Sequence, residues 1–370
     1  MIDCDVHQNF GSLSGVLPWV DPAHRDYLRR AGFGSSGLPS YSAWMHPRST
    51  ARDDSVPPDG DISVSGSDYK TVRDQLLDPL DVEYAILTGK DILSASSLPN
   101  PQAAALANAY NRHLIDEWLS RDLRLKGSLM VDTQDAERAA EEVKAFGDHP
   151  NVVQVLLPCA ATFGYGNPHY HPIYEAAVEI GLPVAIHVGG EGLGIKPPPT
   201  ATGYPGYYAE WHVLLVQCAM LHVASLVFHG VFEKYPELRV VVIEAGVTWL
   251  PPLLWRMDAD WKALHTNAPW VKRPPRETVR EHIRLTTQPL DELDTPEKLR
   301  RTLELVDGLE DMLMFASDYP HRDYDRPDLV SCRLPVSWRE KVMSENARAL
   351  YGLPAWPPDA VAEAGTERAS

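Results

Sequence analysis

The chain has 370 residues, of which 44% are hydrophobic, so it carries enough apolar material for one large domain or two ordinary ones. Its 51 acidic residues exceed its 34 basic ones, which gives a formal net charge of -17 at pH 7. A charge of this sign repels phosphate backbones and anionic lipid headgroups, which excludes nucleic acid and membrane surfaces as expected partners.

The four cysteines (Cys4, Cys159, Cys218 and Cys332) are scattered and show no C-x-x-C spacing, which predicts neither a disulfide framework nor a zinc ribbon. No apolar run approaches about 18 residues, and the N-terminus lacks a basic segment followed by an apolar one. We therefore expect a soluble, cytoplasmic protein with reduced thiols.

Eight short apolar runs predict strands that are buried on both faces. They are the opening "MIDCDVH", "VEYAILTG" (82–89), "LKGSLMV" (125–131), "VVQVLLP" (152–158), "PVAIHVGG" (183–190), "LRVVVIEAG" (238–246), "IRLTT" (283–287) and "DMLMFASD" (311–318). Helical patterns lie between them, for example at 134–146, where alanines, a valine and a phenylalanine share one face. Eight alternations of strand and helix predict an α/β fold, a (β/α)8 TIM-type barrel.

Two stretches do not fit a minimal barrel. Residues 10–67, rich in Pro, Gly, Ser and Asp, predict an insertion after the first strand that covers the barrel mouth. Residues 189–211 form a long Gly/Pro/Tyr loop after the fifth strand, and their aromatic content favours an ordered substrate loop. We expect residues 1–355 to form one barrel domain and residues 356–370 to form a mobile tail.

Residues that can bind metal lie at four of the predicted strand ends. Strand one ends in Asp5 and His7, strand five in His187, strand six in Glu244, and strand eight in Asp318 with His321 just beyond it. Catalytic groups of such barrels lie at the C-terminal strand ends, and Asp5 and His7, two residues apart, point the same way. A lone strand-terminal Asp is often only a turn or capping residue. The joint pattern, however, predicts a site for a divalent transition metal.

Three further histidines lie in the segment 209–235, which predicts one long helix. At a rise of about 1.5 Å per residue, His212 and His222 are about 15 Å apart along the axis, so they do not share an ion. The helix descends from the barrel mouth, which leaves His222 and His229 away from the site. His212 has either a catalytic or supporting role or a packing role under the Tyr-rich loop. Gln288, just past strand seven, either contacts a substrate or shapes the following Pro turn.

Four stretches resemble the amidohydrolase superfamily, in the amidohydrolase-related branch that includes aminocarboxymuconate semialdehyde decarboxylase and resorcylate-type decarboxylases. They are "DCDVH", "IHVGG", "GVFEKYPELRVVVIEAGVTWLPPLLWRMD" and "MLMFASDYPH", and the likeness runs over most of residues 1–350. The resemblance implies a metal-dependent barrel whose ion is bound by Asp5, His7, His187 and Asp318. It also makes a homodimer a reasonable expectation.

The chain departs from the usual pattern of this family on strands one and six. Asp5 replaces the commoner first-strand histidine, and Glu244 stands where many relatives carry a histidine. Glu244 is an additional candidate ligand that can bridge two ions. The cofactor is therefore expected to be one or two divalent ions of zinc, iron or manganese, since oxygen-rich ligand sets favour the harder of these metals.

The carboxylate-rich site predicts a metal-dependent hydrolase that cleaves an acyl bond in a thioester, ester, lactone or amide. A metal-activated water would attack the carbonyl, Asp318 would take and pass on its proton, and His212 or His321 would steady the oxyanion.

Two alternatives stay open. One is non-oxidative decarboxylation of an aromatic or unsaturated acid, in which the metal holds the carboxylate and Asp318 handles the proton. The other is a barrel that has lost catalysis and serves as a binding protein. In each case we expect a small-molecule partner with a hydrophobic or aromatic group, contacted by Tyr207, Tyr208, Trp211 and Gln288.

Overall fold

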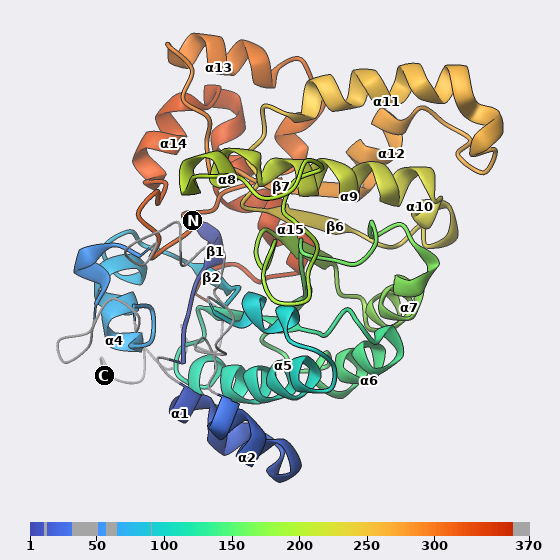
Figure 1. Ribbon diagram of the computed structural model, residues 1–370. Coiled ribbons are helices and arrows are strands. Elements are labelled where there is room, and N and C mark those ends of the chain that lie inside the picture. Colours follow the sequence, from blue (N-terminus) through green and yellow to red (C-terminus); the bar gives the residue numbers. More distant parts are fainter. Residues whose placement is uncertain (11–12, 32–50, 57–64, 90, 358–370) are drawn as a thin grey trace.

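The computed structural model describes residues 1–357 apart from residues 11–12, 32–50, 57–64 and 90. Eight strands run through the middle of the molecule and helices surround them (Figure 1). The strands are β1 (Ile2–Val6), β2 (Tyr84–Leu87), β3 (Leu125–Met130), β4 (Val152–Pro158), β5 (Val184–His187), β6 (Val240–Ile243), β7 (Ile283–Thr286) and β8 (Leu313–Met314). Each strand pairs in parallel with the next, in the order β1 to β8.

Backbone hydrogen bonds join the residues that directly follow β8 to β1. The N–H of Cys4 donates to the carbonyl of Phe315 at 2.9 Å, and the N–H of Asp318 donates to the carbonyl of Asp5 at 3.1 Å. The predicted (β/α)8 barrel is therefore confirmed. The eighth strand is shorter than the predicted 311–318, because the N–H of Phe315 leaves the ladder and donates to Val342 of the π-helical turn η11 (Lys341–Glu345).

Helices alternate with the strands around the outside of the ring. They are α4 (Tyr69–Val72), α5 (Gln102–His113), α6 (Ala136–Phe146), α7 (His171–Ile180), α8 (Tyr208–Leu214), α9 (Val216–Phe228), α10 (Val231–Lys234), α11 (Leu250–Leu264), α12 (Pro275–His282), α13 (Pro296–Leu303), α14 (Pro327–Arg333) and α15 (Asn346–Tyr351). The helix predicted at 134–146 corresponds to α6. It begins at Ala136, and the Asp135 carboxylate caps its N-terminus by accepting a hydrogen bond from the N–H of Arg138. The single helix predicted at 209–235 is divided into α8, α9 and α10, and Gly230, with a φ of 72°, separates the last two.

Helices α8 and α9 form an apolar segment, Tyr208–Phe228, of 21 residues, which by length and composition alone is enough to cross a membrane. The prediction that no apolar run approaches this length was therefore wrong, because His, Gln and Glu210 interrupt a segment that is otherwise apolar. Its inner face packs on the barrel, where Ala219, Val223 and Leu226 are buried. This packing is that of a barrel helix, and the cytoplasmic location stays a prediction.

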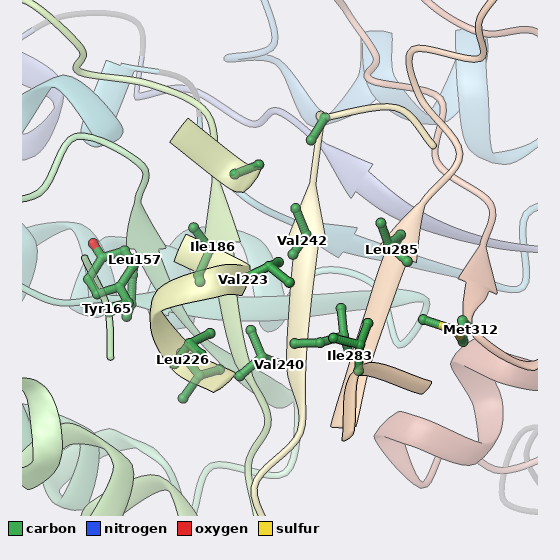
Figure 2. Close-up of a cluster of buried hydrophobic side chains, with 14 of the residues drawn as sticks. Leu157, Tyr165, Ile186, Val223, Leu226, Val240, Val242, Ile283, Leu285 and Met312 are labelled. Atoms are coloured by element: carbon green, nitrogen blue, oxygen red, sulfur yellow. The ribbon is translucent and has the colours of Figure 1, made fainter. Parts of the chain in front are cut away.

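An apolar layer fixes the strands against these helices. Figure 2 shows side chains of β5, β6 and β7 packed with those of α9, among them Ile186, Val240, Val242, Ile283, Val223 and Leu226. Full burial of each such side chain contributes about 1.5–3 kcal/mol. In β6 the side chains alternate, so that Val241 and Ile243 belong to a second cluster with Ala185. The strand ends are thus held on a rigid ring.

The insertion returns to the barrel beside the last strand. Residues 32–50 and 57–64 of the predicted 10–67 segment lie outside the described residues, while α1 (Leu13–Val16) and α2 (Pro22–Ala31) belong to its described part. Ala51 forms an antiparallel bridge with His321, and Arg322 Nε donates to the Ala51 carbonyl at 2.9 Å. Most of the predicted tail also lies outside the described residues, but Trp356 packs edge-to-face on Tyr84 of β2.

Candidate metal centre

Six ionisable side chains meet at the C-terminal ends of the strands. They form two overlapping groups, Asp5, His7, His187 and Glu244 in one, and His7, Glu244, Asp318 and His321 in the other, and the donor atoms of each group all lie within 4.8 Å of one another. The structure thus brings together all five residues predicted as metal ligands, together with His321. Their individual roles stay predictions.

The distances between these donors suit a shared ion. His7 Nε2 lies 2.7 Å from Asp318 Oδ1 and 3.6 Å from Asp5 Oδ1. His187 Nε2 lies 3.3 Å from Asp5 Oδ2 and 3.4 Å from Glu244 Oε2. Ligand bonds of about 2.0–2.3 Å place two donors of one ion about 3 Å apart, which is close to these separations.

Backbone carbonyls orient the two buried histidines. His7 Nδ1 lies 2.5 Å from the carbonyl of Gly89, and His187 Nδ1 lies 2.6 Å from the carbonyl of Val188. With Nδ1 as the donor, the lone pair of each Nε2 faces the cluster, the arrangement of metal-binding histidines. Within the described part of the chain, His7 Nε2 forms no hydrogen bond, although it lies 2.7 Å from Asp318 Oδ1. This buried, orphaned atom fits a metal ligand.

The charges of the cluster oppose the effect of burial. Burial alone would lower the pKa of His7, but the charges of Asp5 and Asp318 raise it to about 9. Burial alone would raise the pKa of Asp5, but the charges of His7 and His187 lower it. Burial and the charge of Asp318 together raise the pKa of Glu244 well above its usual range. Three carboxylates buried this close together repel one another, and a bound cation would stabilise their charged forms.

Two of these carboxylates are carried by strained backbone. Glu244 has a φ of 55° and Asp318 a φ of 63°, both in the left-handed region. A non-glycine residue there costs about 1–3 kcal/mol and persists only where the surrounding structure fixes it. Such strain is concentrated at functional sites, and here it aims two carboxylates at the cluster.

Sequence reasoning missed a polar residue that supports the cluster. Thr88, directly after β2, donates a hydrogen bond from Oγ1 to Asp5 Oδ1 at 2.5 Å. Because Thr88 directly follows β2, the search for polar residues at the ends of strands, which identified the other members of the site, could also have identified Thr88. Gln288 donates from Nε2 to Asp318 Oδ2 at 2.9 Å, and its predicted contact with substrate stays a prediction.

His212 lies at the rim of the centre. Its Nε2 is 3.2 Å from Asp323 Oδ2, and its ring stacks on Tyr208 with centroids 5.6 Å apart. The hydrogen bond to Asp323 raises the pKa of His212 against the effect of burial, and the charge of Asp318 adds to this. Asp323 was not singled out from the sequence, because its partner lies more than a hundred residues away in the chain.

The other aromatic residues and histidines considered in the sequence analysis differ in whether their side chains lie near the centre. Trp211 packs on Tyr208, with ring centroids 5.3 Å apart, whereas Tyr207 is 78% exposed and is not brought to the cluster. His222 lies with Nε2 2.8 Å from the carbonyl of Cys159, and His229 is exposed at the end of α9. Neither His222 nor His229 belongs to the two groups of candidate metal ligands, as predicted from a helix that descends from the barrel mouth.

A parallel (β/α)8 barrel with converging histidines and carboxylates at its C-terminal strand ends has the architecture of a metal-dependent barrel enzyme. A family model described as amidohydrolase matches residues 2–353. The chain therefore belongs to the amidohydrolase family, as the strand-end motifs indicated.

The chain is similar to several decarboxylases. The gamma-resorcylate decarboxylase of Rhodococcus jostii (strain RHA1) is 26% identical over 311 residues, 77% of this chain and 88% of that protein. The structure of 5-carboxyvanillate decarboxylase from Sphingomonas paucimobilis matches with a TM-score of 0.68 at 18% identity, over 95% of this chain and 99% of that one. A dihydroxybenzoic acid decarboxylase from Polaromonas sp. JS666, with bound manganese and the inhibitor 2-nitroresorcinol, matches with a TM-score of 0.64 at 18% identity, over 95% and 98% of the two chains.

These relatives overturn the expected hydrolysis of an acyl bond, thioester hydrolysis included. The prediction was wrong because it treated the replacement of a strand-six histidine by Glu244 as a sign of different chemistry. Carboxylates and imidazoles bind a Lewis-acidic ion for either reaction, so the donor set identifies the cofactor as a divalent transition metal without identifying the bond that breaks.

Proposed function

We propose that this protein is a metal-dependent, non-oxidative decarboxylase of an aromatic acid. The observation that carries the proposal is the cluster of Asp5, His7, His187 and Asp318 at the strand ends, in a chain similar over 77% of its length to a gamma-resorcylate decarboxylase. The relatives are named for hydroxylated or methoxylated benzoates, which makes a benzoate with a hydroxyl group the substrate class to test first.

Asp5, His7, His187 and Asp318 would hold the ion, with Glu244 as an additional ligand. A bound divalent ion, with manganese as the first candidate, would supply a positive charge that anchors the substrate carboxylate. Thr88 and the carbonyls of Gly89 and Val188 keep these ligands in place, so that little reorganisation is needed when substrate binds.

Decarboxylation replaces a ring C–CO2 bond with a C–H bond. A proton must therefore reach the ring carbon that carries the carboxylate, after which the electron pair of the broken C–C bond returns to the ring and carbon dioxide leaves. Asp318 is placed to handle this proton, because Oδ1 faces His7 while Oδ2 accepts the hydrogen bond of Gln288 and keeps a second lone pair for a proton.

His212 is placed to replenish the proton. The hydrogen bond to Asp323 raises the pKa of His212 and so favours its protonated form, and its side chain remains partly exposed. Tyr208 and Trp211 pack beside it and offer flat rings for an aromatic substrate at the rim. Transfer from solvent through His212 to Asp318 would complete the proton balance.

The test is to load the metal-stripped protein with Mn2+ and offer it a panel of hydroxybenzoates. We expect carbon dioxide and the decarboxylated phenol in equal amounts, with one solvent deuterium on the product carbon in D2O. Asp318→Asn should lower kcat by about 10²–10⁴-fold. Asp328→Asn, at an exposed carboxylate paired with Arg326, is the matched control and should retain activity. A loaded protein that releases no carbon dioxide from any member of the panel would argue against the proposal.

A further inference from the structure

Two charged side chains are buried at the barrel mouth outside the groups of candidate metal ligands. Asp132 lies two residues beyond Met130, the last residue of β3, and is 6% exposed. Lys196 lies in the loop that follows β5 and is 5% exposed. Lysine and aspartate are almost never buried to this degree unless they are paired. A buried charge without a close partner costs free energy, and such groups are concentrated at functional sites.

Each of the two side chains keeps unused hydrogen-bonding capacity. Asp132 Oδ1 accepts hydrogen bonds from the N–H and from Nε2 of Gln134, both at 3.1 Å, whereas Oδ2 has no partner among the described residues. Within the same ranges of the chain, no hydrogen bond or ion pair involves Lys196 Nζ, although the charge of Asp132 acts on it. One donor and one acceptor are therefore close to each other without being in contact.

A short segment after β2 holds both residues in place. The carbonyl of Ser97 accepts the N–H of Ile195 at 3.1 Å, and the carbonyl of the next residue, Leu98, accepts Gln134 Nε2 at 2.8 Å. The loop comes so close here that a Cβ on Gly194 would lie 2.2 Å from the Ser97 oxygen. The neighbours of Lys196 and of Asp132 are thus fastened to the same two residues, which positions the pair over the ends of β2 and β3.

The pair lies on the side of the mouth that the candidate metal ligands leave free. Those ligands come from the ends of β1, β5, β6 and β8, whereas β3 lies between β1 and β5 in the strand order. The interior of an eight-stranded barrel is only just wide enough for side chains to fill it. An aromatic acid with its carboxylate at the metal centre would therefore extend the opposite end of its ring toward Asp132 and Lys196.

The chemistry of the pair selects a hydroxyl group. An anion would be repelled by the Asp132 carboxylate, and a cation would be repelled by the Lys196 ammonium. A hydroxyl donates one hydrogen bond to Asp132 Oδ2 and accepts one from Lys196 Nζ, whereas a methoxyl group can only accept. Burial lowers the pKa of Lys196 and raises the pKa of Asp132, so both groups are short of the polar partner that a hydroxyl would supply.

We propose that Lys196 and Asp132 form a specificity subsite that binds a hydroxyl group on the substrate ring, para to the departing carboxylate. This inference rests on the proposed decarboxylation and narrows its substrate to an arenecarboxylate with a hydroxyl at the far end of the ring. Such a hydroxyl also assists the reaction, because its oxygen lone pair conjugates with the ring carbon that takes up the proton. Asp132, as the acceptor of the hydroxyl proton, increases this electron donation.

The test compares three benzenesulfonates that carry a para hydroxyl, a para methoxyl or a para hydrogen. Sulfonates keep the anionic group but cannot lose carbon dioxide, so their dissociation constants do not depend on turnover. Calorimetric titration of the protein loaded with Mn2+ should show about 10–100-fold tighter binding of the hydroxyl compound than of the other two. The matching benzoates should show the same order in kcat/KM for release of carbon dioxide.

Two variants examine the two halves of the subsite. Lys196→Met keeps the length of the side chain but removes the donor, and it should lower the preference for the hydroxyl compound by at least about tenfold. Asp132→Asn replaces Oδ2 by an amide that donates, so the methoxyl compound should bind as well as the hydroxyl compound. Lys262→Met is the matched control, because Lys262 is exposed on α11, and it should keep the full preference.

Equal binding of the three sulfonates by the unaltered protein would overturn the inference, and so would a full preference for the hydroxyl in both Lys196→Met and Asp132→Asn. If the unaltered protein still released carbon dioxide from benzoates, the proposed decarboxylase function would stand without this subsite. A protein that prefers the hydroxyl sulfonate through Lys196 and Asp132 but releases no carbon dioxide would support the subsite and overturn the decarboxylase function.

Discussion

Glu244 Oε2 lies 3.4 Å from His187 Nε2, although regular strand geometry would send these two side chains to opposite faces of the barrel. His187 is in register with Ile243, so both point inward, and the next residue along a strand points outward. The left-handed backbone of Glu244, with a φ of 55°, reverses its direction at the point where β6 ends. Backbone strain therefore delivers a carboxylate to the centre.

This relationship predicts that Glu244→Gly stabilises the metal-free protein. Glycine adopts the left-handed conformation without steric cost, and the change also removes a buried carboxylate. We expect the free energy of unfolding of the metal-free protein to rise by about 1 kcal/mol or more, measured by denaturant titration. The same variant should bind less metal, a trade of function for stability.

Asp81→Gly is the matched control for the backbone effect. Asp81 has a φ of 50° but is exposed and lies away from the centre. It should show the relief of backbone strain without any change in metal content. A metal-free Glu244→Gly protein that is less stable than the unaltered protein would contradict the strain argument.

The barrel and the location of its centre could be predicted from the sequence for a simple physical reason. Strands buried on both faces read as apolar runs, so the polar residues that end them stand out. Asp5, His7 and His187 were found in this way, and the closure of the ring brings Asp5 beside Asp318 although 313 positions separate them in the chain.

The remaining features depend on backbone angles and long-range contacts that a linear pattern does not contain. Glu244 was named as a candidate ligand from its place at the end of a strand, but strict alternation along β6 would send it outward, and its φ of 55° is what turns it to the centre. Tyr207 and Tyr208 are adjacent and alike in sequence, yet one faces solvent and the other stacks on His212. The type of reaction could also not be predicted from the sequence, because the same metal-binding side chains serve hydrolysis and decarboxylation.

Thr88 is predicted to set metal affinity through Asp5. Thr88→Val removes the hydroxyl that donates to Asp5 Oδ1 while keeping the shape of the side chain. Loss of such a supporting hydrogen bond costs about 10–100-fold in metal affinity, which a competition titration with a chelator would measure. Thr88→Ser keeps the hydroxyl and should bind metal nearly as well as the unaltered protein. Equal affinity in the Val and Ser variants would show that the hydrogen bond does not hold Asp5 for the ion.

Asp323 is predicted to set the pH dependence of turnover. Its hydrogen bond raises the pKa of His212, so Asp323→Asn should return that pKa toward the usual value. The protonated form of His212 is the proton donor, and its loss on the alkaline side should then occur at lower pH. The alkaline limb of the kcat profile should move down in pH, and Asp323→Glu should restore it. An alkaline limb that did not move in Asp323→Asn would exclude His212 as the group that titrates.

Removal of the metal is predicted to lower stability in a pH-dependent way. An ion present at 100 times its dissociation constant contributes about 2.7 kcal/mol to the free energy of unfolding, which chelation removes. In the metal-free protein, the carboxylates around His7 raise its pKa to about 9, above the 6.5 of an unperturbed histidine. The folded state then binds more protons than the unfolded state across this interval.

The contribution of His7 is therefore complete below about pH 6.5 and is lost as the pH rises through about 9. Glu244 acts in the same direction, because its pKa is also raised by folding. The metal-free protein should lose stability from neutral to alkaline pH, as thermal melts across this range would record. The metal-bound protein should show a flatter dependence, since a ligand histidine has already lost its proton. Parallel pH profiles with and without metal would show that His7 does not bind the ion.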